Sequence, residues 1–100
     1  MIPLTASVMR GAALALGKAQ RGFRGRVEGI RAAETAPQRL AAELEMRLIE
    51  IGFVEGARVE ILHEGAFGRD PIAVRVNDAT IALRRKEAMA IFVCPLDDGA

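Results

Sequence analysis

One segment, LAAELEMRLIEIGFVEG at positions 40–56, constrains the fold more than any other part of the chain. Four of its apolar residues recur at the spacing of a single helix face: Leu40, Leu44, Leu48 and Ile51. Because a period near 3.6 residues marks an amphipathic helix, the pattern predicts a helix over residues 36–51 with a buried stripe. A chain with one such helix must provide an apolar surface for it to cover.

Two glycines define how this helix ends. Gly52 stands where the helix must stop, and a residue without Cβ enters the left-handed conformation there at little cost. Gly56 follows Glu55 in a pair typical of a tight turn. The predicted structural motif therefore consists of Leu44 and Leu48 on the helix and of Gly52 and Gly56 after it.

Strand-like alternation surrounds the predicted helix. Before it, residues 23–31 alternate between small or apolar and charged side chains. After it, inward positions with period two are Val59, Ile61, Ile72, Val74, Val76, Ile81 and Leu83. Together with a last strand at 91–93, the pattern predicts a mainly β, small α+β fold. Five short strands of this kind bury their apolar face best by closing into an antiparallel barrel, with the one helix inserted after the first strand.

The length of 100 residues predicts one domain, which we place at residues 14–96. Residues 1–13 have no clean period and are predicted to form a loosely ordered arm, and residues 97–100 an acidic tail. A domain this small buries only about 60–65% of its unfolded surface, so weak homo-oligomerisation is an alternative to a monomer. The single cysteine, Cys94, fits a reducing compartment, and the apolar run at 11–17 is too short to span a bilayer. We therefore expect a cytoplasmic protein.

The sequence lacks the patterns of common catalytic and metal sites. There is no phosphate-binding glycine motif, and the chain has one histidine and one cysteine. The available metal ligands are His63, Asp70, Cys94, Asp97 and Asp98, without the spacing of a structural zinc site. We predict no enzyme activity, no cofactor and no resident metal ion.

Three runs of sequence, taken in order, resemble a known family. They are RLIEIGFVEGARVEIL at 47–62, GAFGRDPIAVRV at 65–76 and TIALRRKEAMAIFV at 80–93. This ordered set resembles the FeoA family of ferrous iron transport accessory proteins. Two residues depart from its pattern: Glu55 stands where the family often has proline, and Arg69 adds a residue to the Gly-Asp-Pro loop.

The resemblance implies an SH3-like five-stranded barrel in the bacterial cytoplasm. It also implies a non-enzymatic role, in which the protein docks on the cytosolic GTP-binding part of the FeoB ferrous iron transporter and modulates it. The same barrel occurs as the C-terminal domain of iron-dependent repressors. A repressor-like role would require a DNA-binding chain in addition to this one.

A partner patch is predicted on the outer side of the helix. Met46 and Ile49 lie about half a turn away from the Leu44–Leu48 stripe, and Phe53 follows the helix end. Exposed apolar residues gathered in one place mark interaction sites, so these three are the predicted partner-binding residues. The alternative is that the helix buries a second face or packs at a dimer contact.

The alternative function is a small-barrel regulatory or nucleic-acid-binding module. It would use the basic residues of the first strand region, which are Arg21, Arg24, Arg26 and Arg31. Small barrels that bind single strands generally stack bases on aromatic side chains, and none is interleaved with these arginines. The net charge of +1 also argues against strong nucleic-acid binding by the whole chain.

Overall fold

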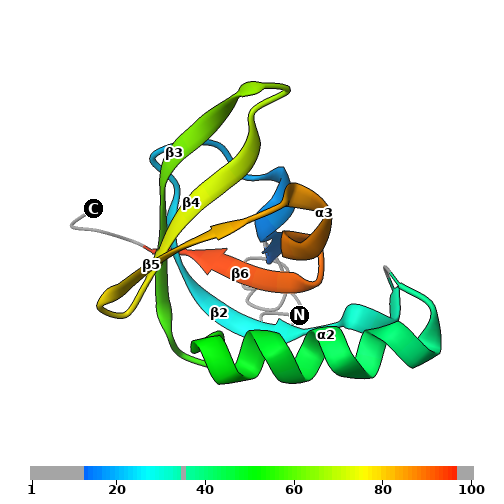
Figure 1. The fold of residues 1–100 in the computed structure, drawn as a ribbon. Coiled ribbons are helices and arrows are strands. Elements are labelled where there is room, and N and C mark those ends of the chain that lie inside the picture. Colours follow the sequence, from blue (N-terminus) through cyan, green and yellow to red (C-terminus); the bar gives the residue numbers. More distant parts are fainter. Residues whose placement is uncertain (1–12, 35, 97–100) are drawn as a thin grey trace, which may run out of the picture.

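The computed structural model describes residues 13–34 and 36–96, so most of the predicted arm and the whole predicted tail lie outside the described residues. Figure 1 shows the elements in sequence colours. In chain order they are β1 (Leu14–Ala15), the 3-10 turn η1 (Leu16–Lys18), β2 (Arg24–Ile30), the 3-10 turn η2 (Ala32–Glu34), α2 (Gln38–Ile51), β3 (Arg58–Phe67), β4 (Asp70–Val76), β5 (Ala79–Leu83), α3 (Arg85–Ala88) and β6 (Ile91–Pro95).

The strands form one strongly curled antiparallel sheet in the order β1-β6-β2-β3-β4-β5. The predicted mainly β fold with one main helix after the first long strand is confirmed. The sheet has a sixth member, β1, which pairs with β6 through Leu14 and Ala15. A strand of two residues is too short to produce a recognisable alternation, and for this reason the sequence predicted five.

The interior is aliphatic and follows the predicted alternation. In β3 and β4, Val59 pairs with Val76 and Ile61 with Val74, and all four side chains are buried. Leu83 of β5 is also buried, and Ile81 packs against the same core while partly exposed. Each inward residue of one strand thus faces an inward residue of the next, which fixes the register, because a one-residue slip would expose the whole set.

Helix α2 begins at Gln38, after Pro37 as N-cap, two residues later than predicted. It ends as predicted. Gly52 has φ of +128°, and its amide donates to the carbonyl oxygens of Leu48 at 3.2 Å and Ile49 at 3.0 Å. Gly56, with φ of +89°, then turns the chain into β3. Both glycines occupy conformations that side chains with a Cβ rarely adopt.

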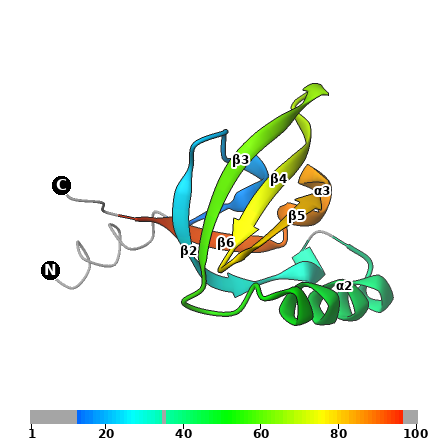
Figure 2. The same ribbon diagram turned by 60° about the vertical axis from the view of Figure 1, so that its left-hand side comes forward.

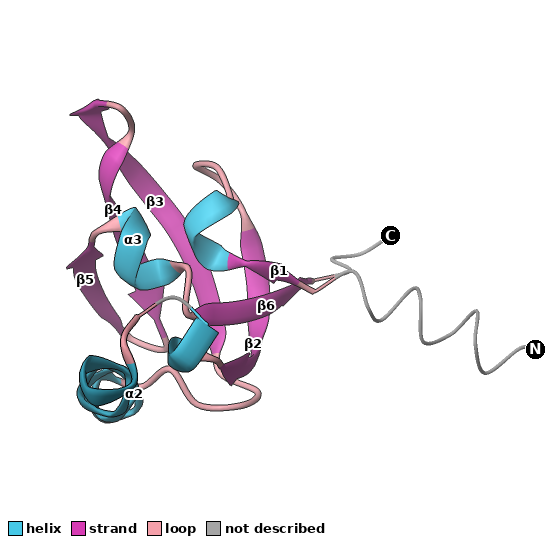
Figure 3. Cartoon of the chain, turned by 90° about the vertical axis from the view of Figure 1, so that its right-hand side faces the viewer, coloured by secondary structure: helices cyan, strands magenta, loops and turns pink. Residues whose placement is uncertain are grey.

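Helix α2 covers less of the sheet than its apolar stripe predicted. Only Ala41 and Leu48 are fully buried, and Leu44 is half-buried. Leu40 is 55% exposed, so the predicted buried stripe is wrong at this residue. The cause is visible in Figures 1 and 2, where the amino-terminal half of α2 runs out beyond the strands. Seen end-on in Figure 3, α2 lies beside the sheet, on the same side as α3.

A single arginine at the start of α3 joins three separate parts of the chain. The Arg85 guanidinium donates to the carbonyl oxygens of Gly17 (2.9 Å), Ala19 (2.7 Å) and Arg69 (2.8 Å), and pairs with Glu64 at 2.8 Å. These residues belong to the η1 region and to the β3–β4 hairpin that projects from the sheet in Figure 2. The planar guanidinium can serve all four oxygens at once, and it thereby fixes the position of α3.

Candidate partner-docking groove

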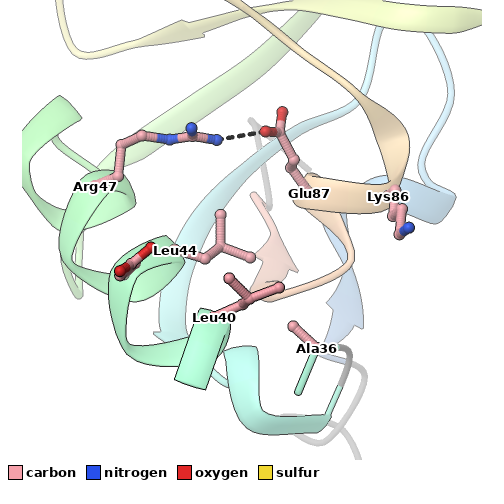
Figure 4. Close-up of a pocket in the computed structure, with 7 residues that line it drawn as sticks. Ala36, Leu40, Leu44, Arg47, Lys86 and Glu87 are labelled. Atoms are coloured by element: carbon pink, nitrogen blue, oxygen red, sulfur yellow. Dashed lines mark hydrogen bonds and ion pairs between the residues drawn. The ribbon is translucent and has the colours of Figure 1, made fainter. Parts of the chain in front are cut away.

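An apolar groove lies between α2 and α3 within the described residues, as Figure 4 shows. Its volume is about 420 Å³. We call it the α2–α3 groove and define it by the residues that line it: Ala36, Leu40, Glu43, Leu44, Arg47, Lys86 and Glu87. Four of the seven belong to α2, at the three- and four-residue spacing of one helix face, so α2 forms one entire wall.

The opposite wall is held in place by hydrogen bonds around α3. The backbone amide of Arg85 donates to Asp70 Oδ1 at 2.9 Å, and its side chain makes the contacts described above. Glu87 Oε1 accepts the backbone amide of Arg84 at 3.1 Å, which caps this short helix. The second wall is therefore fixed although α3 is only four residues long.

An ion pair closes one end of the groove. Arg47 Nη2 on α2 pairs with Glu87 Oε2 on α3, as the dashed line in Figure 4 shows. The two side chains are 56% and 31% exposed, so the pair contributes at most about 1 kcal/mol to stability. The ion pair matters more for binding than for stability, because it places charged groups at the edge of an apolar surface.

The floor of the groove is an apolar surface that a partner could cover. Leu40 and Leu44 point toward α3 in Figure 4, and Ala36 lies beside them. Covering a leucine that is otherwise exposed is worth about 1.5–3 kcal/mol when the burial is complete. An apolar floor with a charged rim is the usual anatomy of a protein-docking site.

The three predicted partner-binding residues differ in their exposure. Met46 is 63% exposed and Ile49 is 45% exposed, in keeping with an outward position, but neither lines the α2–α3 groove. Phe53 has no exposed surface, so its inclusion in a surface patch is wrong. Once Gly52 ends the helix, the chain turns inward, and Phe53 becomes the largest fully buried side chain of the described residues.

A smaller hollow of about 190 Å³ lies beside the predicted patch. It is lined by Gly29, Ile30, Glu45, Ile49, Phe53, Val54 and Glu55. Val54, 45% exposed, was not among the predicted residues, and it extends the apolar surface next to Ile49. The outer side of α2 is thus a second, shallower apolar area, distinct from the α2–α3 groove.

The sequence did not reveal the groove itself. The signal that could have found it is Glu87, three residues after Arg84 in a capping arrangement that starts a helix. Even so, nothing in the sequence places that helix opposite Leu40, because the two are 45 or more residues apart. Phe67, almost fully exposed at the tip of the β3–β4 hairpin, was also not singled out from the sequence.

Within residues 13–34 and 36–96, no group of three or more His, Cys, Asp or Glu side chains is arranged to hold a metal ion. His63 lies exposed on β3, Cys94 lies on β6, and Asp70 accepts the Arg85 amide. Asp97 and Asp98 lie outside the described residues. The described part of the chain also contains no helix long and apolar enough to cross a membrane.

The curled antiparallel sheet with an inserted helix defines the class of SH3-like small β domains. The family model described as the FeoA domain matches residues 14–95, and the chain therefore belongs to the FeoA domain family. No curated protein sequence matches the chain.

Solved structures agree with this assignment. The FeoA protein from Chlorobium tepidum is 31% identical, with a TM-score of 0.65 over 86% of this chain and 75% of the other. FeoA from Stenotrophomonas maltophilia, solved with zinc, is 28% identical, with a TM-score of 0.63 over 78% of this chain and 86% of the other. Its description names an SH3 domain protein and a candidate ferrous iron transport activating factor.

The fold is also similar to part of a larger regulator. A manganese-dependent transcriptional repressor is 28% identical, with a TM-score of 0.64. The match covers 84% of this chain and only 42% of the repressor. The likeness therefore concerns one domain of that protein.

Proposed function

We propose that this chain is a non-enzymatic accessory protein of ferrous iron uptake that acts in the cytoplasm. In this role it docks through the α2–α3 groove on the cytosolic GTP-binding part of a FeoB-type transporter. The support from relatives is membership of the FeoA domain family and the transport-activating role suggested for its Stenotrophomonas member.

The single observation that carries the proposal is the exposed leucine in the groove. Leu40 is 55% exposed on a wall that also holds the half-buried Leu44, and a rigid second helix faces both. Such an arrangement can accept an apolar side chain or a helical turn of a partner, with Arg47 and Glu87 at the rim. The function that an apolar floor with a charged rim supports is binding.

Two matched substitutions on one helix test the proposal. Leu40→Glu places a charge in the groove, and Met46→Glu places the same charge on the outer side of α2. Both residues are exposed, so both variants are expected to fold, as thermal unfolding followed by circular dichroism would verify.

We expect Leu40→Glu to weaken binding to the purified cytosolic part of a FeoB-type transporter by about tenfold or more, because it removes apolar burial and places a charge in the interface. Met46→Glu should change the affinity by less than about twofold. The reverse pattern would move the docking site to the surface around Met46 and Ile49 and overturn the assignment of the groove.

The similarity to the manganese-dependent repressor supports a second candidate. In that reading the chain is a regulatory module that binds a protein carrying a DNA-binding domain. Capture of the chain by such a protein, with equal affinity for wild type and Leu40→Glu, would favour this alternative over the transporter.

A further inference from the structure

The outer surface of β2, β3 and β4 collects arginines from three distant parts of the sequence. The inward residues of these strands are buried, and the exposed residues between them include Arg24 and Arg26 of β2, Arg58 of β3 and Arg75 of β4. We call these four residues the arginine face. Only the β2 pair belongs to the basic segment that the sequence had singled out.

The strand register brings these charges together. Arg26 stands directly opposite Arg58, while Glu60 stands opposite Arg24 on one side and Arg75 on the other. Four positive charges against one negative charge leave a local net charge of +3. Like charges directly opposite each other on neighbouring strands destabilise a sheet, so the Arg26–Arg58 pair is unfavourable for folding.

Three of these arginines lack a partner within the described residues. No ion pair or side-chain hydrogen bond forms there at Arg26, Arg58 or Arg75, whereas Arg47 and Arg85 are each paired. A guanidinium carries five donors in a planar fork that matches a carboxylate. The arginine face therefore holds unused donors suited to anionic groups.

A shallow hollow of about 140 Å³ marks the centre of this surface. It is lined by Arg24, Arg58, Val59, Glu60, Arg75, Asn77 and Leu96. Leu96 is fixed at the rim, where its amide donates to the carbonyl oxygen of Arg24 at 3.0 Å.

We propose that the arginine face is a second interaction surface, which binds an acidic segment of a partner protein. The hollow has room for single carboxylates, and the arginines flank Glu60 on both sides. A nucleic acid fits less well, because no aromatic side chain lines the hollow to stack on a base. The negative charge of Glu60 would also repel a phosphate backbone that crosses the hollow. The proposal does not depend on what occupies the α2–α3 groove.

The test uses fluorescence anisotropy with a short fluorescein-labelled peptide rich in aspartate. The reference probes are the same peptide with every aspartate replaced by asparagine and a labelled single-stranded DNA. Arg58→Glu is the main variant and Arg39→Glu the matched control, since Arg39 is also exposed but lies on α2 outside the groove lining.

Arg58→Glu should weaken binding of the aspartate peptide by about tenfold or more, because charge-assisted hydrogen bonds are lost and repulsion is added. The same substitution places opposite charges at positions 26 and 58, so the melting temperature should stay equal or rise. Binding and stability thus change in opposite directions, which a misfolded variant cannot imitate. Arg75→Gln, at another position of the hollow, should also weaken binding.

Several outcomes would overturn the proposal. Equal losses in Arg58→Glu and Arg39→Glu would mark general electrostatics, and tighter binding of the DNA would make the face a nucleic-acid surface. Equal affinity for the asparagine peptide would remove the role of the carboxylates. If the aspartate peptide bound only to the double variant Asp97→Asn/Asp98→Asn, the chain's own C-terminal carboxylates, and not those of a partner, would be the ligand of the arginine face.

Discussion

The α2–α3 groove and the arginine face recognise partners by different physical means. The groove is floored by leucine, and the helix that forms its main wall carries three glutamates and two arginines, a net charge of −1. The arginine face and Glu60 together have a net charge of +3. Binding in the groove should depend on buried surface and change little with salt, whereas the arginine face should lose affinity once salt shortens the Debye length to about 8 Å.

The comparison shows that arginine has two different roles in this molecule. Arg85 is enclosed, paired and structural, and it holds one wall of the groove. Arg58 is exposed and unpaired within the described residues, and it opposes another arginine. Removing the first should therefore harm the fold, and removing the second should harm only an interaction.

The largest expected effect comes from Arg85→Ala. It removes the charged partner of Glu64 and the side-chain donor to three carbonyl oxygens, and should lower the free energy of unfolding by about 3 kcal/mol. Urea unfolding measures this change. Arg84→Ala, at the neighbouring exposed arginine, is the control and should change stability by less than about 0.5 kcal/mol. Similar losses in the two variants would contradict the structural role of Arg85.

A smaller effect is expected from Gly52→Ala, which disturbs the end of α2. With φ at +128°, an added Cβ strains the backbone whatever the space around it, and we expect a loss of about 1–3 kcal/mol. Gly29→Ala is the control, because Gly29 has no positive φ and nothing lies near its would-be Cβ. If both variants melt at the wild-type temperature, the conformation assigned to Gly52 is wrong.

The smallest effect concerns the ion pair at the groove rim. A double-mutant cycle with Arg47→Ala and Glu87→Ala should give a coupling energy below about 1 kcal/mol, because both side chains are substantially exposed. Thermal unfolding of the four proteins provides the measurement. A coupling well above this value would make the pair a main support of the groove rather than a polar rim.

The sequence predicted local features well. The two-residue alternation predicted that Val59, Ile61 and Val74 are interior, and they are buried. Gly52 predicted the end of the helix, and it adopts the positive φ expected there. These features depend on neighbours within a few residues along the chain. For the same reason the family resemblance, carried by an ordered set of local motifs, led to the right domain family.

Features that depend on the packing of distant segments were missed. Leu40 continued the helical stripe correctly, but only the position of α2 against the sheet shows that its first turns extend beyond the strands. Phe53 was included in the partner patch because it follows the helix end, but the chain turns inward after Gly52 and buries its side chain. The arginine face needed the strand register, which no single strand specifies.

The most direct test of the central claim is a map of amide chemical shifts. The isotope-labelled chain is titrated with the unlabelled cytosolic part of a FeoB-type transporter. The account predicts that the largest changes fall at Leu40, Leu44 and Lys86, around the α2–α3 groove. Largest changes at Met46, Ile49 and Val54, with the groove residues unmoved, would contradict it.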